Sequence, residues 1–225
     1  MQGLALVEQI RRFAMPEGVI ECRGTWLRQR GEMRFARDRP WLPFEAEQWF
    51  EGSGIDFRWH ACVRIAPFVS ARVVDSFLQG RGELTARVLG IIPVARSSGP
   101  ATDRGEALRG LAELPWRPFV FGDAKSFTWE MAGPNNLHAT FDDGRTRASC
   151  DFEVDNEGQV LGGVAAARPR TVGKLVVDTP WSGVFREYQV FDGLRVPTMA
   201  EAIWDLPDGP FTYWRGQVTD LRALR

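Results

Sequence analysis

Alternation of apolar and polar residues recurs along most of this 225-residue chain, and it is the feature that most restricts the possible fold. In residues 56–66, for example, Phe57, Trp59 and Ile65 fall on one face and Arg58 falls on the other. A period of two predicts a half-buried strand. Short sequences rich in Gly, Pro, Asn and Asp separate these runs, as expected for hairpin turns. The chain is therefore predicted to be mainly β.

Two segments have helical rather than strand-like spacing. Residues 4–14 carry apolar side chains at helical intervals and end before Pro16. Residues 103–114 begin with Asp103 and Glu106, which form a capping-box pattern. Strands are expected within 19–95 and 126–222, at residues 19–30, 32–37, 43–51, 56–66, 69–78, 83–95, 126–132, 136–142, 145–154, 158–168, 183–191, 194–206 and 211–222.

These elements predict a mainly β (α+β) fold class. We expect a single large curved antiparallel sheet, an open half-barrel of roughly nine to eleven strands, with two short helices covering its concave side or its mouth. The break at 96–102 could mark a domain boundary. Neither half has a second helix to cover its apolar face, so we expect residues 1–225 to form a single domain.

The charge balance excludes some classes of partner. The chain has 28 basic and 29 acidic residues, which gives no general attraction to nucleic acid or to an anionic membrane, although local basic patches fit this balance. We expect no membrane span and no signal peptide. Cys22, Cys62 and Cys150 are odd in number and widely spaced, which favours reduced, buried thiols and a cytoplasmic location. The oligomeric state is not set by these features.

Motifs for common cofactors and nucleophiles are absent from the sequence. There is no dinucleotide-binding glycine motif, no phosphate-binding loop and no Gly-x-Ser-x-Gly elbow. His60 and His138 are the only histidines, and no cysteine or histidine cluster has metal-ligand spacing. We therefore expect no metal and no cofactor.

Two polar residues fall on the inward faces of predicted strands. Asp75 shares its face with Val73 and Phe77, so its carboxylate needs a partner or a raised pKa. It pairs with an arginine of a neighbouring strand, lies near the solvent-exposed end of its own strand, or serves as a general acid/base or polar anchor in a cavity. Gln48 shares a face with Phe50 and either bonds a neighbouring backbone group or orients a ligand.

Arg109 and Glu113 lie four residues apart on the second predicted helix. They form either an ordinary exposed helix pair or, if the helix closes the mouth of the curved sheet, a pair that faces the opening. Trp116 follows directly and would stand beside them.

The chain contains nine tryptophans. Trp59, Trp129 and Trp204 sit in strands with apolar neighbours, so they either fill a core or line a cavity. Tyr188 adds a ring with a polar tip that could meet an oxygen of a ligand.

A set of short motifs runs through nearly the whole chain, at residues 30–34, 41–48, 57–61, 75–76, 80–82, 108–116, 179–181, 196–197, 204–210 and 213–216. Together these motifs resemble one family, the bacterial proteins of unknown function catalogued as DUF6920 (earlier DUF6544). The resemblance implies no established reaction and therefore no catalytic roles. Gly110 departs from the pattern, since a tyrosine is expected there. The layout is also similar to the lipoprotein-carrier fold, an open half-barrel over a hydrophobic cavity.

The leading hypothesis is a protein that binds a lipid or another apolar small molecule, with Trp59, Trp129 and Trp204 lining the cavity. Asp75, Gln48 or Arg109 would then fix one polar group of the ligand. A small-molecule enzyme would use the same hollow, with Asp75 or Glu113 as acid/base and Arg109 stabilising a developing anion. A protein-interaction module with an aromatic surface is the third hypothesis.

Overall fold

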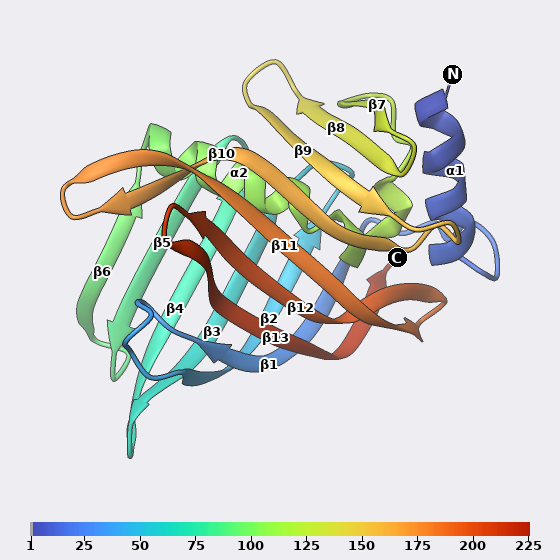
Figure 1. Ribbon diagram of the computed structural model, residues 1–225. Coiled ribbons are helices and arrows are strands. Elements are labelled where there is room, and N and C mark those ends of the chain that lie inside the picture. Colours follow the sequence, from blue (N-terminus) through green and yellow to red (C-terminus); the bar gives the residue numbers. More distant parts are fainter. Residues whose placement is uncertain (1) are drawn as a thin grey trace.

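The computed structural model describes residues 2–225, in which 13 strands form one antiparallel sheet (Figure 1). Two α-helices accompany the sheet within these residues, α1 (Gln2–Ala14) and α2 (Pro100–Ala112). The mainly β class and the open, curved sheet are therefore confirmed, but the expected number of nine to eleven strands is too low. The strands are β1 (Gly24–Met33), β2 (Leu42–Glu51), β3 (Phe57–Ala66), β4 (Val69–Leu78), β5 (Arg81–Val88), β6 (Ile92–Ser98), β7 (Phe127–Gly133), β8 (Asn136–Asp142), β9 (Arg147–Val154), β10 (Val160–Val172), β11 (Leu175–Phe191), β12 (Leu194–Leu206) and β13 (Gly209–Leu224).

The strand order explains how the sheet curls around a helix. The order is β6-β5-β4-β3-β2-β1-β13-β12-β11-β10-β9-β8-β7, so only β1 and β13 are neighbours that are not consecutive in sequence. The first and last strands meet in the middle, and β6 and β7 are the two edges. The segment between these edges holds α2 and two short 3-10 helices, η1 (Leu114–Trp116) and η2 (Pro118–Val120). The chain therefore crosses from one edge to the other through α2.

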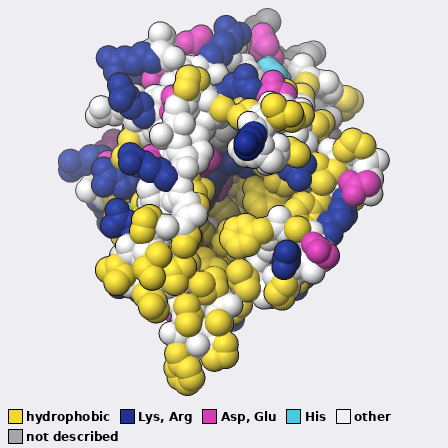
Figure 2. All heavy atoms as spheres, turned by 90° about the vertical axis from the view of Figure 1, so that its left-hand side faces the viewer, with side chains coloured by type: hydrophobic (Ala, Val, Ile, Leu, Met, Phe, Trp, Pro, Cys, Tyr) yellow, Lys and Arg dark blue, Asp and Glu magenta, His cyan; other side chains and the backbone are white. Residues whose placement is uncertain are grey.

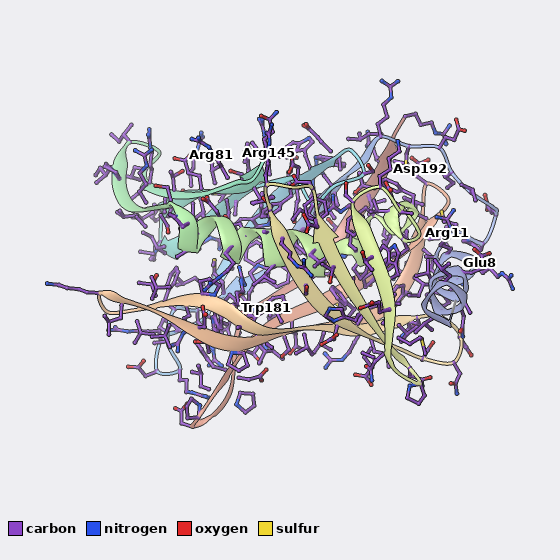
Figure 3. The ribbon with its side chains drawn as sticks, turned by 90° about the horizontal axis from the view of Figure 1, so that it is seen from above. Glu8, Arg11, Arg81, Arg145, Trp181 and Asp192 are labelled. Atoms are coloured by element: carbon purple, nitrogen blue, oxygen red, sulfur yellow. The ribbon has the colours of Figure 1, made fainter. Side chains whose placement is uncertain are left out.

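Helix α2 lies inside the curve of the sheet. It contacts β4, β5 and β6 on one side and β9 and β10 on the other. Figure 3, seen from above, shows α2 between the first strands and the β10–β11 pair. Ala107 and Leu111 are completely buried there. The helix starts at Pro100 after Gly99, without a side-chain cap, so the expected capping box at Asp103 and Glu106 is wrong.

Helix α1 covers a different part of the sheet. Its apolar residues Val7 and Ile10 are buried, and the helix contacts β7, β8, β12 and η2. It stands at the end of the sheet opposite the β10–β11 turn (Figure 1). The helix expected at 4–14 is confirmed as α1. The helix in the hollow of the sheet is α2, which contacts strands from both halves of the chain.

Inward-facing residues follow the predicted alternation where the strand is regular. Phe57, Trp59 and Val63 of β3 are all buried, and so are Asp75 and Phe77 of β4. The expectation for Ile65 is wrong, because the β3–β4 register shifts between Arg64 and Ala66 and leaves Ile65 exposed.

The strand boundaries differ most where the turn lacks the usual residues. The segment 83–95 is two strands, β5 and β6, joined at Leu89 and Gly90, which both have positive φ. The expected strand at 32–37 is absent, because β1 continues only to Met33. Strand β10 ends at Val172, four residues after the expected end of the strand at 158–168. Strand β11 begins at Leu175, eight residues before the expected start of the strand at 183–191.

The cysteines are only partly as expected. All three are free, and Cys150 is buried, but Cys62 is exposed on the outer face of β3. The expectation of three buried thiols is therefore wrong. No helix within residues 2–225 is long and apolar enough to cross a membrane.

Candidate functional site

A cavity of about 380 Å³ lies between α2 and the concave face of the sheet. Its walls come from β1, β3 to β6, β10 to β13 and α2, so strands from both halves of the chain enclose it. Figure 2 shows the hollow on the end of the molecule, with hydrophobic side chains around it and charged groups deep inside. A volume above about 300 Å³ is typical of small-molecule sites.

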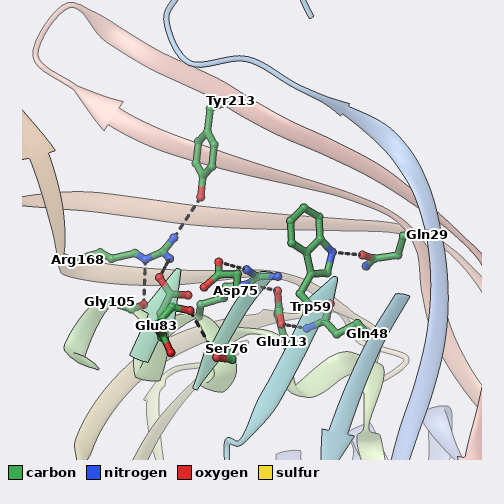
Figure 4. Close-up of polar contacts among 12 residues, drawn as sticks. Gln29, Gln48, Trp59, Asp75, Ser76, Glu83, Gly105, Glu113, Arg168 and Tyr213 are labelled. Atoms are coloured by element: carbon green, nitrogen blue, oxygen red, sulfur yellow. Dashed lines mark hydrogen bonds and ion pairs between the residues drawn. The ribbon is translucent and has the colours of Figure 1, made fainter. Parts of the chain in front are cut away.

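Arg109 of α2 is the centre of the polar network in this cavity. Its Nη1 donates to Asp75 Oδ2 at 2.6 Å, and its Nε donates to Glu113 Oε1 at 2.8 Å. The second oxygen of Glu113 accepts from Gln48 Nε2 at 2.6 Å. The guanidinium also lies over the ring of Phe57, 4.7 Å from its centroid. Arg109 therefore joins the helix to β2, β3 and β4 (Figure 4).

Arg168 of β10 forms a second polar centre on the other side of the cavity. Its Nε donates to the carbonyl of Gly105 at 3.1 Å, and its Nη1 donates to the hydroxyl of Tyr213 at 3.1 Å. Trp181 Nε1 donates to the same hydroxyl at 3.1 Å. Arg168 Nη2 also lies 3.6 Å from Glu106 Oε1. Figure 4 shows the Arg168 side chain between the Tyr213 hydroxyl and Gly105.

The cluster is close to electrically neutral at pH 7. The carboxylates Asp75, Glu106 and Glu113 face the guanidinium groups of Arg109 and Arg168, so full ionisation would leave one excess negative charge. Burial, together with the nearby Asp75, raises the pKa of Glu106 to about 8. A neutral Glu106 removes that excess.

Burial also changes the other ionisation equilibria. Burial raises the pKa of Asp75, and this effect outweighs the opposing charge of Arg109. Burial acts to lower the pKa of Arg109, but the carboxylates of Glu113 and Asp75 raise it overall, so this arginine stays charged. Asp75 Oδ1 and Glu106 Oε2 are buried without any hydrogen-bond partner. Two carboxyl oxygens beside the cavity therefore lack partners: Asp75 Oδ1 is an acceptor, and Oε2 of a protonated Glu106 is a donor.

Aromatic side chains form most of the remaining wall. Trp59 is held in place by its Nε1, which donates to Gln29 Oε1 at 2.9 Å. Trp116 Nε1 donates to the carbonyl of Pro197 at 2.9 Å. These bonds satisfy the polar tips of the two rings, and both side chains line the cavity. The aromatic lining consists of Trp59, Trp116, Trp181, Phe185, Trp204, Tyr213 and Trp214.

Some residues proposed from the sequence lie elsewhere. Gln48 is completely buried behind the cavity wall and reaches it only through Glu113. Trp129 is stacked on Phe127 and donates to the carbonyl of Asp123, away from this cavity. Tyr188 donates to the carbonyl of Val160 at 2.7 Å, also outside it. The structure thus brings together Trp59, Asp75, Arg109, Glu113, Trp116 and Trp204.

Among residues 2–225, no group of three or more histidine, cysteine or acidic side chains has the arrangement of a metal site. One histidine does contact an acidic side chain: Nδ1 of His138 on β8 lies 2.6 Å from Asp151 Oδ1 on β9. That pair belongs to the outer part of the sheet.

Comparisons with known proteins agree with the fold. A model described as a family of unknown function (DUF6544) matches residues 5–216. The chain belongs to this family. The match carries the name DUF6544 and does not test the name DUF6920. No curated protein matches the chain.

Two solved structures show the same fold at low sequence identity. A LolA superfamily protein from Nitrosomonas europaea has 10% identity and a TM-score of 0.52, covering 99% of this chain and 93% of that one. A DUF1329 family protein from Desulfovibrio piger has 14% identity and a TM-score of 0.54, covering 98% and 92%. The predicted likeness of this DUF6544 member to lipoprotein-carrier half-barrels is confirmed at the level of architecture.

Sequence reasoning missed two charged residues that line the cavity of this protein. Glu106 was assigned to a helix cap, although Glu106, Arg109 and Glu113 are spaced three and four apart and so share one helix face. Arg168 was missed because a bulge between Ala165 and Arg168 breaks the strand alternation and turns the arginine inward.

Gly110 is the position where the family resemblance leads us to expect tyrosine. A Cβ atom at Gly110 would stand 2.3 Å from the carbonyl oxygen of Ile55. The neighbouring Arg117 is completely buried and donates to the Gly110 carbonyl at 2.9 Å. Close packing of α2 on the β2–β3 loop therefore requires glycine at this position of this chain.

Proposed function

We propose that this protein binds one apolar small molecule, such as a single-chain lipid, in the cavity between α2 and the sheet. The observation that carries the proposal is the cavity itself, about 380 Å³ with walls built mainly of tryptophan, phenylalanine and aliphatic side chains. A concave, mainly apolar cavity of this size with a few polar groups is the usual form of a small-molecule site.

The polar floor of the cavity would select one end of the guest. Asp75 Oδ1 lacks a donor, Oε2 of the protonated Glu106 lacks an acceptor, and both residues line the cavity. A buried acceptor without a donor is costly, and a hydroxyl or amino group on the guest would supply one. We therefore propose an amphiphile whose donor group lies near Asp75 and Glu106 and whose chain points toward the mouth.

Native mass spectrometry of gently purified protein tests the proposal. We expect a co-purifying apolar molecule, or a thermal shift with members of a lipid panel. Ala202 lines the cavity, and Ala202→Phe should remove both signals while the fold is kept. Ala101→Phe, at the α2 end of the cavity, is a second filling variant in case the first one unfolds. Failure of every lipid to bind the wild type would refute the proposal.

The selection of a donor group is tested separately. A long-chain alcohol and its methyl ether have the same apolar chain and can both accept from a protonated Glu106, but only the alcohol can donate to Asp75. We expect the alcohol to bind about tenfold more tightly, which corresponds to one hydrogen bond near 1.4 kcal/mol. Equal affinities would leave the cavity function intact and remove the role of Asp75.

An enzyme remains the second candidate because of Glu106. Its pKa of about 8 is typical of a general acid or base near neutral pH. Both oxygens of Glu113 and one oxygen of Asp75 are already hydrogen-bonded, so the acid/base role proposed for them from the sequence suits Glu106 better. If a turnover is found, Glu106→Gln should abolish it without lowering the melting temperature.

A further inference from the structure

Exposed apolar side chains gather at the end of the molecule where the cavity opens. Phe68 in the β3–β4 turn is fully exposed, Ile91 in the β5–β6 turn is 75% exposed, and Leu175 at the β10–β11 turn is 69% exposed. Figure 2 shows this end, with hydrophobic side chains around the hollow and on the projecting turn below it. Large exposed apolar patches in soluble proteins mark interaction surfaces.

The β10–β11 hairpin projects beyond the rest of the sheet. Pairing of β10 with β9 ends at Val164, and pairing of β11 with β12 begins at Trp181. Beyond these points the two strands pair only with each other, from Arg168 and Thr179 to the turn. Val172, Leu175, Val176 and Val177 are all exposed on this free ribbon. A two-stranded ribbon with apolar residues on both faces is unusual unless something covers it.

The same hairpins flank the mouth of the cavity. Val176 and Thr171 of the ribbon line the cavity, as do Leu84 and Ser97 of β5 and β6. A surface that covers these hairpins would therefore stand directly over the opening.

Around the tips of these hairpins the charged residues are all of one sign. Residues 64–74, 84–102 and 158–177 contain no aspartate or glutamate. Their exposed or partly exposed basic residues are Arg64, Arg72, Arg87, Arg96, Arg170 and Lys174, of which Arg96 pairs with Glu83 just outside these ranges. Because the whole chain has a net charge of −1, this separation of charge concentrates positive potential at one end.

We propose that the three hairpins dock onto an anionic lipid surface, with their apolar tips inserted at the headgroup level and their basic residues against the lipid phosphates. Apolar tips surrounded by basic residues are the composition of interfacial membrane anchors. Docking in this orientation would place the cavity mouth against the bilayer. The inference rests on the exposed hairpins and extends the proposed binding function.

Vesicle flotation tests this docking. The wild type should bind vesicles of phosphatidylcholine mixed with phosphatidylglycerol, bind pure phosphatidylcholine vesicles much more weakly, and be released by salt. The triple variant Phe68→Ser, Ile91→Ser, Leu175→Ser should lose about tenfold or more of its vesicle affinity. These residues do not line the cavity, so ligand binding measured without vesicles should be unchanged. Vesicle binding and cavity binding can thus fail independently.

A matched control uses exposed apolar residues away from this end. Leu4, Val19 and Val190 are 59%, 71% and 49% exposed. The triple variant Leu4→Ser, Val19→Ser, Val190→Ser should bind vesicles like the wild type. Equal loss in both triple variants, or no wild-type binding to anionic vesicles, would overturn the proposal. A wild-type dimer in light scattering that becomes monomeric in the Phe68→Ser, Ile91→Ser, Leu175→Ser variant would also overturn the proposal. This end of the molecule would then be an interface between two copies of the chain.

Discussion

Arg109 Nη1 lies 2.6 Å from Asp75 Oδ2, and this buried ion pair fixes α2 to the sheet above the cavity. Only 15% of the Arg109 side chain and 9% of the Asp75 side chain are exposed. The same guanidinium holds Glu113, so one cation compensates two carboxylates. Removing it leaves both carboxylates without the charge that permits their burial.

Arg109→Ala should therefore destabilise the protein strongly. Breaking a buried pair by removing one partner costs about 3–5 kcal/mol, because the remaining charges stay desolvated. Urea denaturation measures the loss. Arg96→Ala is the control, because the Arg96–Glu83 pair is on the surface and should contribute less than about 1 kcal/mol. Similar losses in the two variants would show that the Arg109 cluster has no special role in the fold.

Glu106 should make stability fall as pH rises. Its pKa is raised from 4.5 to about 8, so between these values the folded protein holds a proton that the unfolded chain releases. The contribution is fully present below about pH 4.5 and is lost as pH rises through about 8. Denaturation of wild type and Glu106→Gln from pH 5 to pH 9 measures it. The advantage of the variant should grow with pH; a constant difference would contradict the shift.

Gly110→Ala should destabilise the protein by about 1–3 kcal/mol through overpacking. The added Cβ would stand 2.3 Å from the Ile55 carbonyl oxygen, and the backbone must move to admit it. Gly105→Ala in the same helix is the control, since its nearest neighbour, the Pro169 oxygen, is 3.9 Å away. Alanine is a better helix former than glycine by about 1 kcal/mol, so this control should be neutral or more stable. The opposite order of melting temperatures would refute the close packing.

Tyr213→Phe should cost about 1–3 kcal/mol, because both Arg168 Nη1 and Trp181 Nε1 lose their acceptor. A double-mutant cycle with Trp181→Phe separates this loss from packing. Once Tyr213 is replaced, Trp181→Phe should cost less than it does in the wild type. Additive losses would show that the Tyr213 hydroxyl does not link the two side chains.

The sequence was sufficient for the fold class but not for every strand. Alternation in residues 56–66 predicted β3, and Asp192–Gly193 predicted the β11–β12 turn. The Leu89–Gly90 and Gly173–Lys174 turns were missed because apolar residues flank them on both sides and no change of pattern marks the turn. The apolar residues beside these two turns include Ile91 and Leu175, which are exposed and belong to the proposed membrane-docking surface. Their apolar character therefore does not indicate burial in the core.

The cavity was predictable in part. Asp75 was identified because one carboxylate interrupted an otherwise apolar strand face, and Arg109 because of its spacing from Glu113. Glu106 was not identified, because it was interpreted as part of a helix cap. Arg168 was not identified, because a bulge in β10 interrupts the strand alternation. Trp59 and Trp129 have the same local pattern, yet only Trp59 lines the cavity. The difference depends on which strands meet across the sheet, which short-range periodicity does not contain.

Tryptophan quenching by a chain-brominated long-chain alcohol tests occupation of the cavity most directly, because bromine quenches indole rings only on contact. The indoles of Trp59, Trp181 and Trp204 line the cavity. We predict saturable quenching at one alcohol per protein, weak quenching by the unbrominated alcohol, and loss of the effect in Ala202→Phe. No saturable quenching up to the solubility of the alcohol, or the same quenching in the filled variant, would contradict an apolar guest in this cavity.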